Sequence, residues 1–282
     1  MARVSFDDIS RIELDRQLSP SLSAKDAERE LLHNEAETAR LVGNGLRRMV
    51  DERYGKRPRA LYDVTAPAEG TALPCIVFIH GGFWQEGSKA GSGFAARAFT
   101  DAGWAHVALG YSLAPEVRLE DIVEEMGTAL RTLRERADGY GIDPDRLVLV
   151  GHSAGAHLAA AAVCGLAGDL PGIRGMVGLS GVYDLAPIAG SYVDAALGLD
   201  GEDIDRLSPL LREPAPVELR LVVGADETEA FLRQTTGLAD AWADALPGLT
   251  VERVPGRDHF DILQELARPR SATFRHILEM GA

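Results

Sequence analysis

The segment LVLVGHSAGAHLAA, residues 147–160, most constrains what this chain can fold into. Four apolar residues lead into Gly151, a serine stands between Gly151 and Gly155, and an alanine-rich run follows. This order predicts a buried strand, a sharp turn of small residues and a buried helix. A G-x-S-x-G turn in that position strains the backbone at the serine and lifts the hydroxyl clear of the sheet edge. We therefore predict that Ser153 is a nucleophile.

Apolar runs alternate with helical patterns along most of the chain. Strands are expected at 75–80, 105–111, 146–150, 175–180, 219–225 and 249–254, and helices near 93–102, 119–137, 154–167, 228–245 and 260–280. Near-continuous apolar strands separated by helices are typical of a mostly parallel sheet covered on both faces. The expected fold class is α/β, in a single domain over residues 1–282 with its catalytic core at 56–282.

Residues 1–55 are expected to form a helical N-terminal flank or cap. From Ser23 to Arg53 the sequence is charged, and its apolar residues fall at helical spacing: Leu31, Leu32, Leu41, Leu46 and Met49. Such spacing predicts one or two amphipathic helices lying over the main body. Capping of the active site and ordinary packing both remain open as roles for this flank.

The net charge and the distribution of apolar residues indicate which classes of partner and which cell compartment to expect. Forty-three acidic and 29 basic residues give a net charge of −14, which repels a phosphate backbone or an anionic membrane. Residues 1–15 show no apolar leader, and no segment approaches 18 uninterrupted apolar residues. We expect a cytoplasmic protein without nucleic-acid or membrane partners. Cys75 and Cys164 lack CxxC spacing and are expected to be buried free thiols.

A second motif, His80-Gly81-Gly82-Phe83-Trp84, follows the expected strand CIVFIH. A serine nucleophile needs fixed donors for the oxyanion that develops on its substrate. Glycines let backbone N–H groups turn toward such an oxygen. We assign the oxyanion hole to the amides of Gly82, Phe83 and Ala154. An ordinary glycine turn before a helix is the alternative interpretation.

The serine also needs a base and a carboxylate, which follow it in the chain order serine, acid, histidine. His259 lies in a loop after an expected strand and before the last helix, and it is the predicted base. Asp226 directly follows the strand LRLVVGA and is the predicted acid, with Glu227 and Asp184 as competitors. The flanking Asp258 and Asp261 are expected to be loop and helix-cap residues.

The remaining histidines fit a catalytic role less well. His33 and His276 fall on charged helices, His106 in a strand, and His157 one turn into the helix after Ser153. These four are expected to be structural or solvated. His152 and His157 do not form an H-E-x-x-H pair, so no metal site is expected, and nothing indicates a cofactor.

Together, HGGFWQEGSK, YSLAP, GHSAGAHLAA, LSGVYDLAPI, LSPL, ADETEAFLRQT and DHFDIL resemble the kynurenine formamidase (arylformamidase) family. This family belongs to the α/β-hydrolase superfamily and is close to the HGGG-type esterases. The resemblance runs from about Leu61 to the final helix and more loosely into the flank. It implies cofactor-free cleavage of N-formylkynurenine to kynurenine and formate through a formyl-enzyme. Homodimerisation is a further implication of the resemblance.

Carried over by position, the family's nucleophile matches Ser153, its acid Asp226, its base His259 and its oxyanion loop the HGGFW segment. Related enzymes hydrolyse other small amides, carbamates or esters with the same motifs. A carboxylesterase or amidase acting on another small aryl substrate is therefore the alternative. A scaffold that only binds a ligand is a second rival, although a binder has no need of a nucleophile, an acid, a base and an oxyanion loop.

Four residues are candidates for a small-molecule substrate pocket: His80, Gly81, Trp84 and Tyr183. Phe83 and Trp84 either line an aromatic pocket or pack beneath the oxyanion loop. Tyr183 either borders the pocket or closes a strand.

Overall fold

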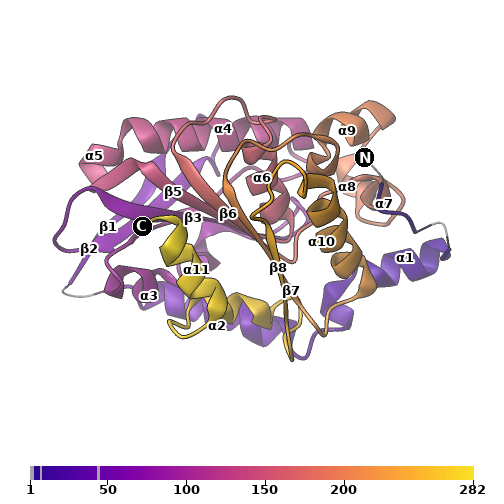
Figure 1. The fold of residues 1–282 in the computed structure, drawn as a ribbon, viewed down its shortest axis with the longest axis horizontal. Helices are drawn as coiled ribbons and strands as arrows, with labels where there is room; N and C mark the ends of the chain where they lie inside the picture. Colours follow the sequence, from indigo (N-terminus) through magenta and orange to yellow (C-terminus); the bar gives the residue numbers. More distant parts are fainter. Residues whose placement is uncertain (1–2, 7, 43–44) are drawn as a thin grey trace.

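The computed structural model describes residues 3–6, 8–42 and 45–282, and it is built on one eight-stranded sheet (Figure 1). The strand order is β1-β2-β4-β3-β5-β6-β7-β8. The strands are β1 (Leu46–Arg53), β2 (Leu61–Pro67), β3 (Leu73–Ile79), β4 (Ala105–Leu109), β5 (Ile142–His152), β6 (Ile173–Leu179), β7 (Glu218–Gly224) and β8 (Thr250–Val254). Strand β1 pairs antiparallel with β2, and β2 antiparallel with β4, whereas β3 to β8 all run parallel. The mostly parallel sheet confirms the predicted α/β class.

Helices cover both faces of the sheet (Figure 1). One face carries α4 (Leu119–Glu135), α5 (Ala137–Tyr140), α6 (Ala154–Val163) and α10 (Glu229–Trp242), and the other carries α3 (Ala96–Asp101) and α11 (Ala272–Met280). Three short helices, α7 (Ala186–Ala189), α8 (Asp194–Leu197) and α9 (Gly201–Leu207), lie between β6 and β7 in the sequence. Helices were predicted near α3, α4, α6, α10 and α11, and these predictions are confirmed.

The central strands supply a separate apolar core to each face. Successive side chains of a strand point to opposite sides. In β3, Val77 packs with the α4, α6 and α10 side, while Ile76 and Phe78 pack with the α3 and α11 side. In β5, Leu149 packs with the α4, α6 and α10 side, and Val150 packs with the α3 and α11 side. Strands buried on both faces therefore read as the continuous apolar runs seen in the sequence.

The N-terminal flank differs from the prediction at two places. Residues Leu46–Arg53, expected to be helical, form the edge strand β1, with Met49 paired to Val64 of β2. The open edge of β2 accepts this partner, and pairing along the edge outweighs the helical spacing of Leu46 and Met49. The sheet therefore begins at Leu46, ten residues before the expected core.

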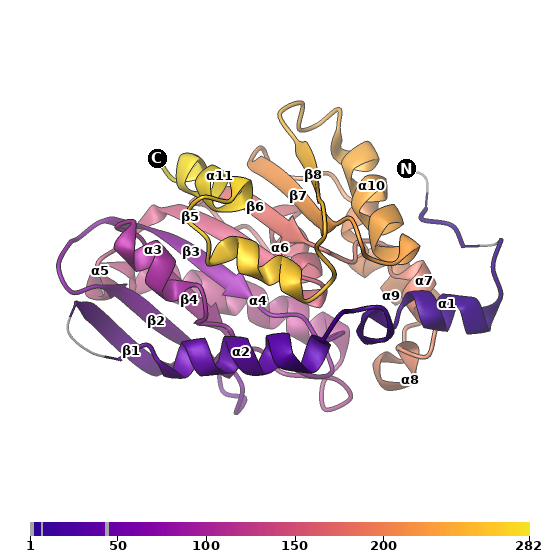
Figure 2. The same ribbon diagram turned by 90° about the horizontal axis from the view of Figure 1, so that it is seen from below.

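The flank does contain α1 (Arg11–Gln17), the 3-10 turn η1 (Pro20–Leu22) and α2 (Ala27–Ala39). Figure 2 shows α1 beside α10 and α2 running past the edge of the sheet. The residues of α2 that are buried are Asn34 and Thr38, whereas Leu31 and Leu32 are more than half exposed. The leucines thus do not form the inward face that their spacing suggested. Among the described helices, none is both long enough and apolar enough to cross a membrane.

Candidate active site

The nucleophile turn lies where β5 passes directly into α6. Ser153 has φ 54° and ψ −119°, a strained conformation for a residue with a side chain. A Cβ on Gly151 would lie 2.3 Å from the carbonyl oxygen of Gly155, and a Cβ on Gly155 would lie 2.1 Å from that of Ile79. Only glycine fits at these two positions. The close packing explains the G-x-S-x-G spacing and the predicted placement of Ser153.

Ser153 and His259 line the same cavity of about 340 Å³ at the carboxyl ends of the central strands. Both are almost fully buried, with 2% and 4% of their surface exposed. His259 lies between β8 and the 3-10 turn η4 (Asp261–Leu266), as predicted for the base. The lining residues are Pro20, Ser21, Leu31, Asn34, Glu35, Phe78, 80–83, 86–88, 91–92, Phe94, 152–153, Tyr192, 259–260 and Leu263.

The carboxylate that contacts His259 is Glu227, and the prediction of Asp226 in this place is wrong. Glu227 Oε2 lies 2.8 Å from His259 Nδ1, and the Glu227 side chain is fully buried. Its other oxygen accepts hydrogen bonds from the Gly224 amide, at 2.7 Å, and from Ser180 Oγ. Because a carboxylate accepts, Nδ1 of His259 carries the proton and Nε2 is left with its lone pair.

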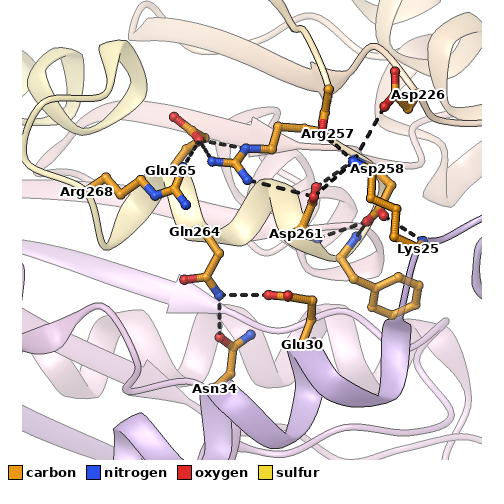
Figure 3. Close-up of polar contacts among 12 residues, drawn as sticks. Lys25, Glu30, Asn34, Asp226, Arg257, Asp258, Asp261, Gln264, Glu265 and Arg268 are labelled. Atoms are coloured by element: carbon orange, nitrogen blue, oxygen red, sulfur yellow. Dashed lines mark hydrogen bonds and ion pairs between the residues drawn. The ribbon is translucent and has the colours of Figure 1, made fainter.

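Asp226 points away from this site. The Asp226 amide donates to the carbonyl of Arg257, which turns the aspartate side chain outward, and the side chain is 49% exposed. The next residue along the turn, Glu227, then faces inward. Asp226 instead lies 3.5 Å from Lys25 Nζ, in the polar network of Figure 3.

The third candidate acid, Asp184, is occupied by the N-terminal segment. Its carboxylate is fully buried and lies 2.7 Å from Arg3 Nη1. Its second oxygen accepts from the amide of Val4 at 2.8 Å. Asp184 therefore anchors the beginning of the described chain.

The loop after β3, predicted to supply the oxyanion hole, borders the cavity. Gly82 and Phe83 have φ angles of 105° and 45° and line the cavity. Within the described chain, the amides of Gly82, Phe83 and Ala154 donate to no backbone or side-chain acceptor. Tyr111 Oη fixes the base of the loop by donating to the His80 carbonyl at 2.8 Å. Of the three residues that carry these amides, Gly82 and Phe83 line the same cavity as Ser153, and Ala154 follows it directly in the chain.

The four predicted pocket residues divide into two pairs. His80 and Gly81 line the cavity. Trp84 and Tyr183 are fully buried and are not part of its lining, so their assignment to the pocket is wrong. Trp84 packs beneath the loop, where its ring and that of His157 meet nearly at right angles with their centroids 4.9 Å apart. A positive φ of 59° at Trp84 turns this side chain inward.

Several lining residues were missed in the sequence. The N-terminal flank supplies Pro20, Ser21, Leu31, Asn34 and Glu35, so it does cap the site. The sequence indicated a flank or cap but not these particular residues, because they are far in the sequence from the other lining residues. A larger surface groove of about 790 Å³ lies at the amino ends of β6, β7 and β8, the opposite end of the sheet from Ser153.

Polar contacts join the flank to the loop that carries His259 (Figure 3). The Lys25 amide donates to Asp258 at 2.9 Å, and Lys25 Nζ lies 3.2 Å from Asp261. Asp258 also accepts from the amides of Phe260 and Asp261, which confirms its predicted place as a loop and cap residue. Gln264 in η4 donates to Asn34 of α2. The cap and the base are thus parts of one hydrogen-bonded assembly.

Burial keeps the neighbouring histidines neutral. Loss of solvation lowers the pKa of His80 to about 4 and that of His152 to about 3. The pKa values of His157 and His106 fall to about 4 and about 3 for the same reason. His157 and His106 are core residues, in agreement with their predicted structural role. Cys75 and Cys164 are free, as predicted, but only Cys75 is fully buried, whereas Cys164 is partly exposed.

Known proteins share both the sequence and the fold of this chain. Residues 62–177 match the family model BD-FAE. The kynurenine formamidase of Danio rerio is 31% identical over 96% of this chain and 97% of its own length. An isoprenylcysteine alpha-carbonyl methylesterase of Arabidopsis thaliana is 29% identical over 58% of this chain and 43% of its own.

A solved structure from Silicibacter sp. TM1040, provisionally described as a thioesterase, superposes with a TM-score of 0.84. It is 26% identical to this chain, and the match covers 94% of this chain and 99% of that one. Because the sequence similarity to the Danio rerio enzyme spans nearly the whole of both chains, this chain is a hydrolase that belongs to the kynurenine formamidase family and has the α/β-hydrolase fold.

Proposed function

We propose that the protein hydrolyses the formamide of N-formylkynurenine to kynurenine and formate, with Ser153 as nucleophile, His259 as base and Glu227 as acid. The observation that carries this proposal is the shared cavity. It brings together Ser153 on its strained turn, the oxyanion loop, and His259 with Glu227 at 2.8 Å. Family membership supports the choice of a formamide as substrate.

In the first step, His259 Nε2 takes the proton from Ser153 Oγ as the oxygen attacks the formyl carbon. Glu227 stabilises the imidazolium that results. Negative charge moves to the formyl oxygen, where the amides of Gly82, Phe83 and Ala154 donate to it. Such donors are worth about 3 kcal/mol each in related chemistry because they are already oriented when the charge develops.

In the second step, the imidazolium of His259 gives its proton to the aryl nitrogen, and the carbon–nitrogen bond breaks. Kynurenine leaves as the free aniline, and Ser153 keeps the formyl group as an ester. Water then attacks this ester with His259 again as base, the His259 imidazolium returns its proton to Ser153 Oγ as the ester bond breaks, and formate leaves. The balance is one water consumed for each formamide cleaved, with neither cofactor nor metal.

The lining of the cavity suits an aromatic substrate. Phe78, Phe83, Phe94 and Phe260 contribute apolar rings, and Leu31 and Leu263 contribute aliphatic groups. A formyl group is the smallest acyl group, so the small space next to the oxyanion loop is sufficient for it. The volume of about 340 Å³ falls within the range of small-molecule sites.

The test is the hydrolysis of N-formyl-L-kynurenine beside a panel of aryl esters, followed by absorbance, for the wild type and Ser153→Ala. We expect a high kcat/KM on the formamide and a loss of kcat of at least about 10⁴-fold in the variant. Circular dichroism checks that Ser153→Ala is folded. A Ser153→Ala enzyme with wild-type turnover would contradict the assignment of the nucleophile.

An aryl or methyl ester is the second candidate substrate, because the chain also resembles a methylesterase over part of its length. Strong ester cleavage with weak formamide turnover would support this alternative and leave the three catalytic residues in place. Labelling of Ser153 by a fluorophosphonate is expected for either activity. A protein that is not labelled and turns over neither substrate would instead be a binding scaffold.

We also propose that the enzyme acts in the cytoplasm and forms a homodimer. Gel filtration with light scattering tests the dimer, and cell fractionation tests the compartment. A monomeric enzyme of full activity would rule out a catalytic need for the dimer.

A further inference from the structure

His152 is buried beside the proposed catalytic residues, yet the mechanism above does not use it. Its Nε2 lies 2.8 Å from the backbone carbonyl oxygen of His259. A carbonyl oxygen can only accept, so Nε2 is the nitrogen that carries the hydrogen. Burial lowers the pKa of His152 to about 3, and the ring is therefore neutral at physiological pH. Its other nitrogen, Nδ1, must then be an unprotonated hydrogen-bond acceptor.

This acceptor borders the cavity next to the nucleophile. His152 is part of the cavity lining, and Nδ1 has no hydrogen-bond partner among the described residues. A Cβ placed on Gly81 would lie 3.0 Å from His152 Nδ1 and 2.9 Å from Ser153 Cβ, so both groups lie against the same glycine of the cavity wall. The His152 and His259 rings are 4.8 Å apart with 48° between their planes.

His80 also lines the cavity, but its ring nitrogens are bonded differently from those of His152. Its Nδ1 is engaged with the Gly81 carbonyl at 2.8 Å. Its Nε2 is enclosed, with no hydrogen-bond partner among the described residues. His152 Nδ1 is not among these enclosed atoms. Of these two buried rings, His152 is the one that can receive a hydrogen bond from a substrate.

We propose that His152 Nδ1 accepts the N–H of the scissile formamide, so that the site favours amides that carry this hydrogen over esters. The inference rests on the proposed function, because it concerns the bond that Ser153 attacks. The scissile nitrogen would lie between two rings with opposite roles. Protonated His259 gives it a proton, while its own N–H points toward His152.

The physical reason for the selectivity is the unpaired acceptor. An ester oxygen in place of the nitrogen has no hydrogen, so it would set its lone pair against that of His152 Nδ1. A site built to bond a substrate N–H rejects analogues that lack it, because the buried polar group is left without a partner. The bond also orients the nitrogen lone pair toward His259, which the departing aniline requires.

The experiment compares formanilide, N-methylformanilide and phenyl formate in the wild type, His152→Gln and His152→Phe. Each rate is divided by the rate of alkaline hydrolysis of the same compound to remove intrinsic reactivity. In His152→Gln the amide nitrogen still reaches the His259 carbonyl, whereas His152→Phe keeps a ring but neither nitrogen. We expect the ratio of kcat/KM for formanilide over phenyl formate to fall about 10- to 100-fold in both variants.

The rate on phenyl formate separates this role from a structural one. We expect it to rise in His152→Gln, because the acceptor that opposes the ester oxygen is gone, whereas loss of a structural role would lower the ester and amide rates together. His157→Gln is the matched control. His157 Nε2 also bonds a backbone carbonyl, that of Leu207 at 2.8 Å, but His157 does not line the cavity. Its formanilide to phenyl formate ratio should equal that of the wild type.

Three results would overturn the proposal. An unchanged ratio in both His152 variants, or an equal loss on amide and ester, would leave the formamidase function standing and remove His152 from specificity. Equal corrected rates on formanilide and N-methylformanilide in the wild type would do the same without any variant. A wild type that cleaves phenyl formate but neither formanilide nor N-formylkynurenine would overturn both proposals together.

Discussion

The catalytic edge, defined by Ser153, Glu227 and His259, and the N-terminal cap, residues 3–6 and 8–42, meet at one cavity but are held by different interactions. Each of the three side chains in the catalytic edge is less than 10% exposed. Leu14 and Leu18 anchor the cap in the apolar core, but its part next to the His259 loop is attached by polar contacts, such as those of Lys25, whose side chain is more than half exposed. Leu32 of the cap is more than half exposed, and Leu31 is half exposed although it borders the cavity.

This difference separates the residues that carry out the reaction from the contacts that control entry of the substrate. Buried hydrogen bonds in a low-dielectric interior hold the reacting groups in one geometry, and their loss is costly. Exposed ion pairs contribute about 0–1 kcal/mol each and are weakened by salt. We therefore expect substitutions in the catalytic edge to lower kcat and substitutions in the cap contacts to raise KM.

The adjacent carboxylates Asp226 and Glu227 test this separation most directly. Glu227→Gln should lower kcat by about 10³- to 10⁴-fold, because an amide at this place no longer fixes the His259 tautomer or stabilises its cation. Asp226→Asn should stay within about threefold, because it removes only an exposed contact with Lys25. Steady-state kinetics of both variants on one substrate measure the two losses of kcat and show which carboxylate acts with His259. A larger loss in Asp226→Asn would reverse our assignment.

Acid is expected to lower the free energy of unfolding, because the folded protein buries neutral histidines. His80, His106, His152 and His157 are buried with lowered pKa values, so the unfolded chain binds protons that the folded chain does not. Stability is therefore fully present above about pH 6.5 and is lost as the pH falls toward 4 or 3. Each histidine contributes a slope of at most about 1.4 kcal/mol per pH unit.

His106→Leu isolates one of these contributions. Neither ring nitrogen of His106 has a hydrogen-bond partner in the part of the chain that the structure describes, and the ring packs against those of Phe78 and Phe99. We expect His106→Leu to gain about 2 kcal/mol more stability, relative to wild type, at pH 5 than at pH 8. Urea unfolding at the two pH values measures this difference. A gain that is equal at both values would show that His106 does not resist protonation in the folded protein.

The accuracy of prediction from the sequence differs between the two regions for a physical reason. The turn at Ser153 and the glycine loop of Gly82 and Phe83 next to the cavity could be predicted because strand, glycine turn and helix are local patterns. The acid was misplaced by one residue because its direction depends on a distant pairing, that of Asp226 with Arg257. Two neighbours in a turn point to opposite sides, and no local pattern says which one faces inward.

The cap was predicted less well for a related reason. Helical spacing indicated an apolar face on α2, yet Asn34 and Thr38 are its buried residues, because the surface that receives them is polar. Gln264 donates to Asn34, and Thr38 Oγ1 accepts from the Gly93 amide. Strand β1 likewise depends on the open edge of β2. Such partners become visible only when the chain is folded.

Tyr111 positions the oxyanion loop, and its loss is expected to have a moderate effect. Tyr111→Phe removes the hydroxyl that donates to the His80 carbonyl and should lower kcat about tenfold with little change in KM. The matched control is Tyr54→Phe, since Tyr54 Oη also donates to a buried carbonyl, that of Gly110 at 2.7 Å. Equal kinetic losses in the two variants would indicate general destabilisation instead of a role at the loop.

The cap contact of Lys25 is expected to give the smallest change. Lys25→Met removes the ion pairs from Nζ to Asp226 and Asp261 but keeps the backbone bond from the Lys25 amide to Asp258. Because Pro20 and Ser21 line the cavity, a looser cap should raise KM about two- to fivefold and leave kcat nearly unchanged.

High salt should raise the KM of the wild type toward that of Lys25→Met, since exposed ion pairs are screened. The variant itself should respond less to salt. Lys56→Met, at an exposed lysine of the described chain that does not line the cavity, controls for the change in net charge. A fall in kcat for Lys25→Met at constant KM would mean that the cap positions His259 itself. The cap would then affect the reaction as well as substrate entry, through the loop of Asp258 and His259 that it contacts.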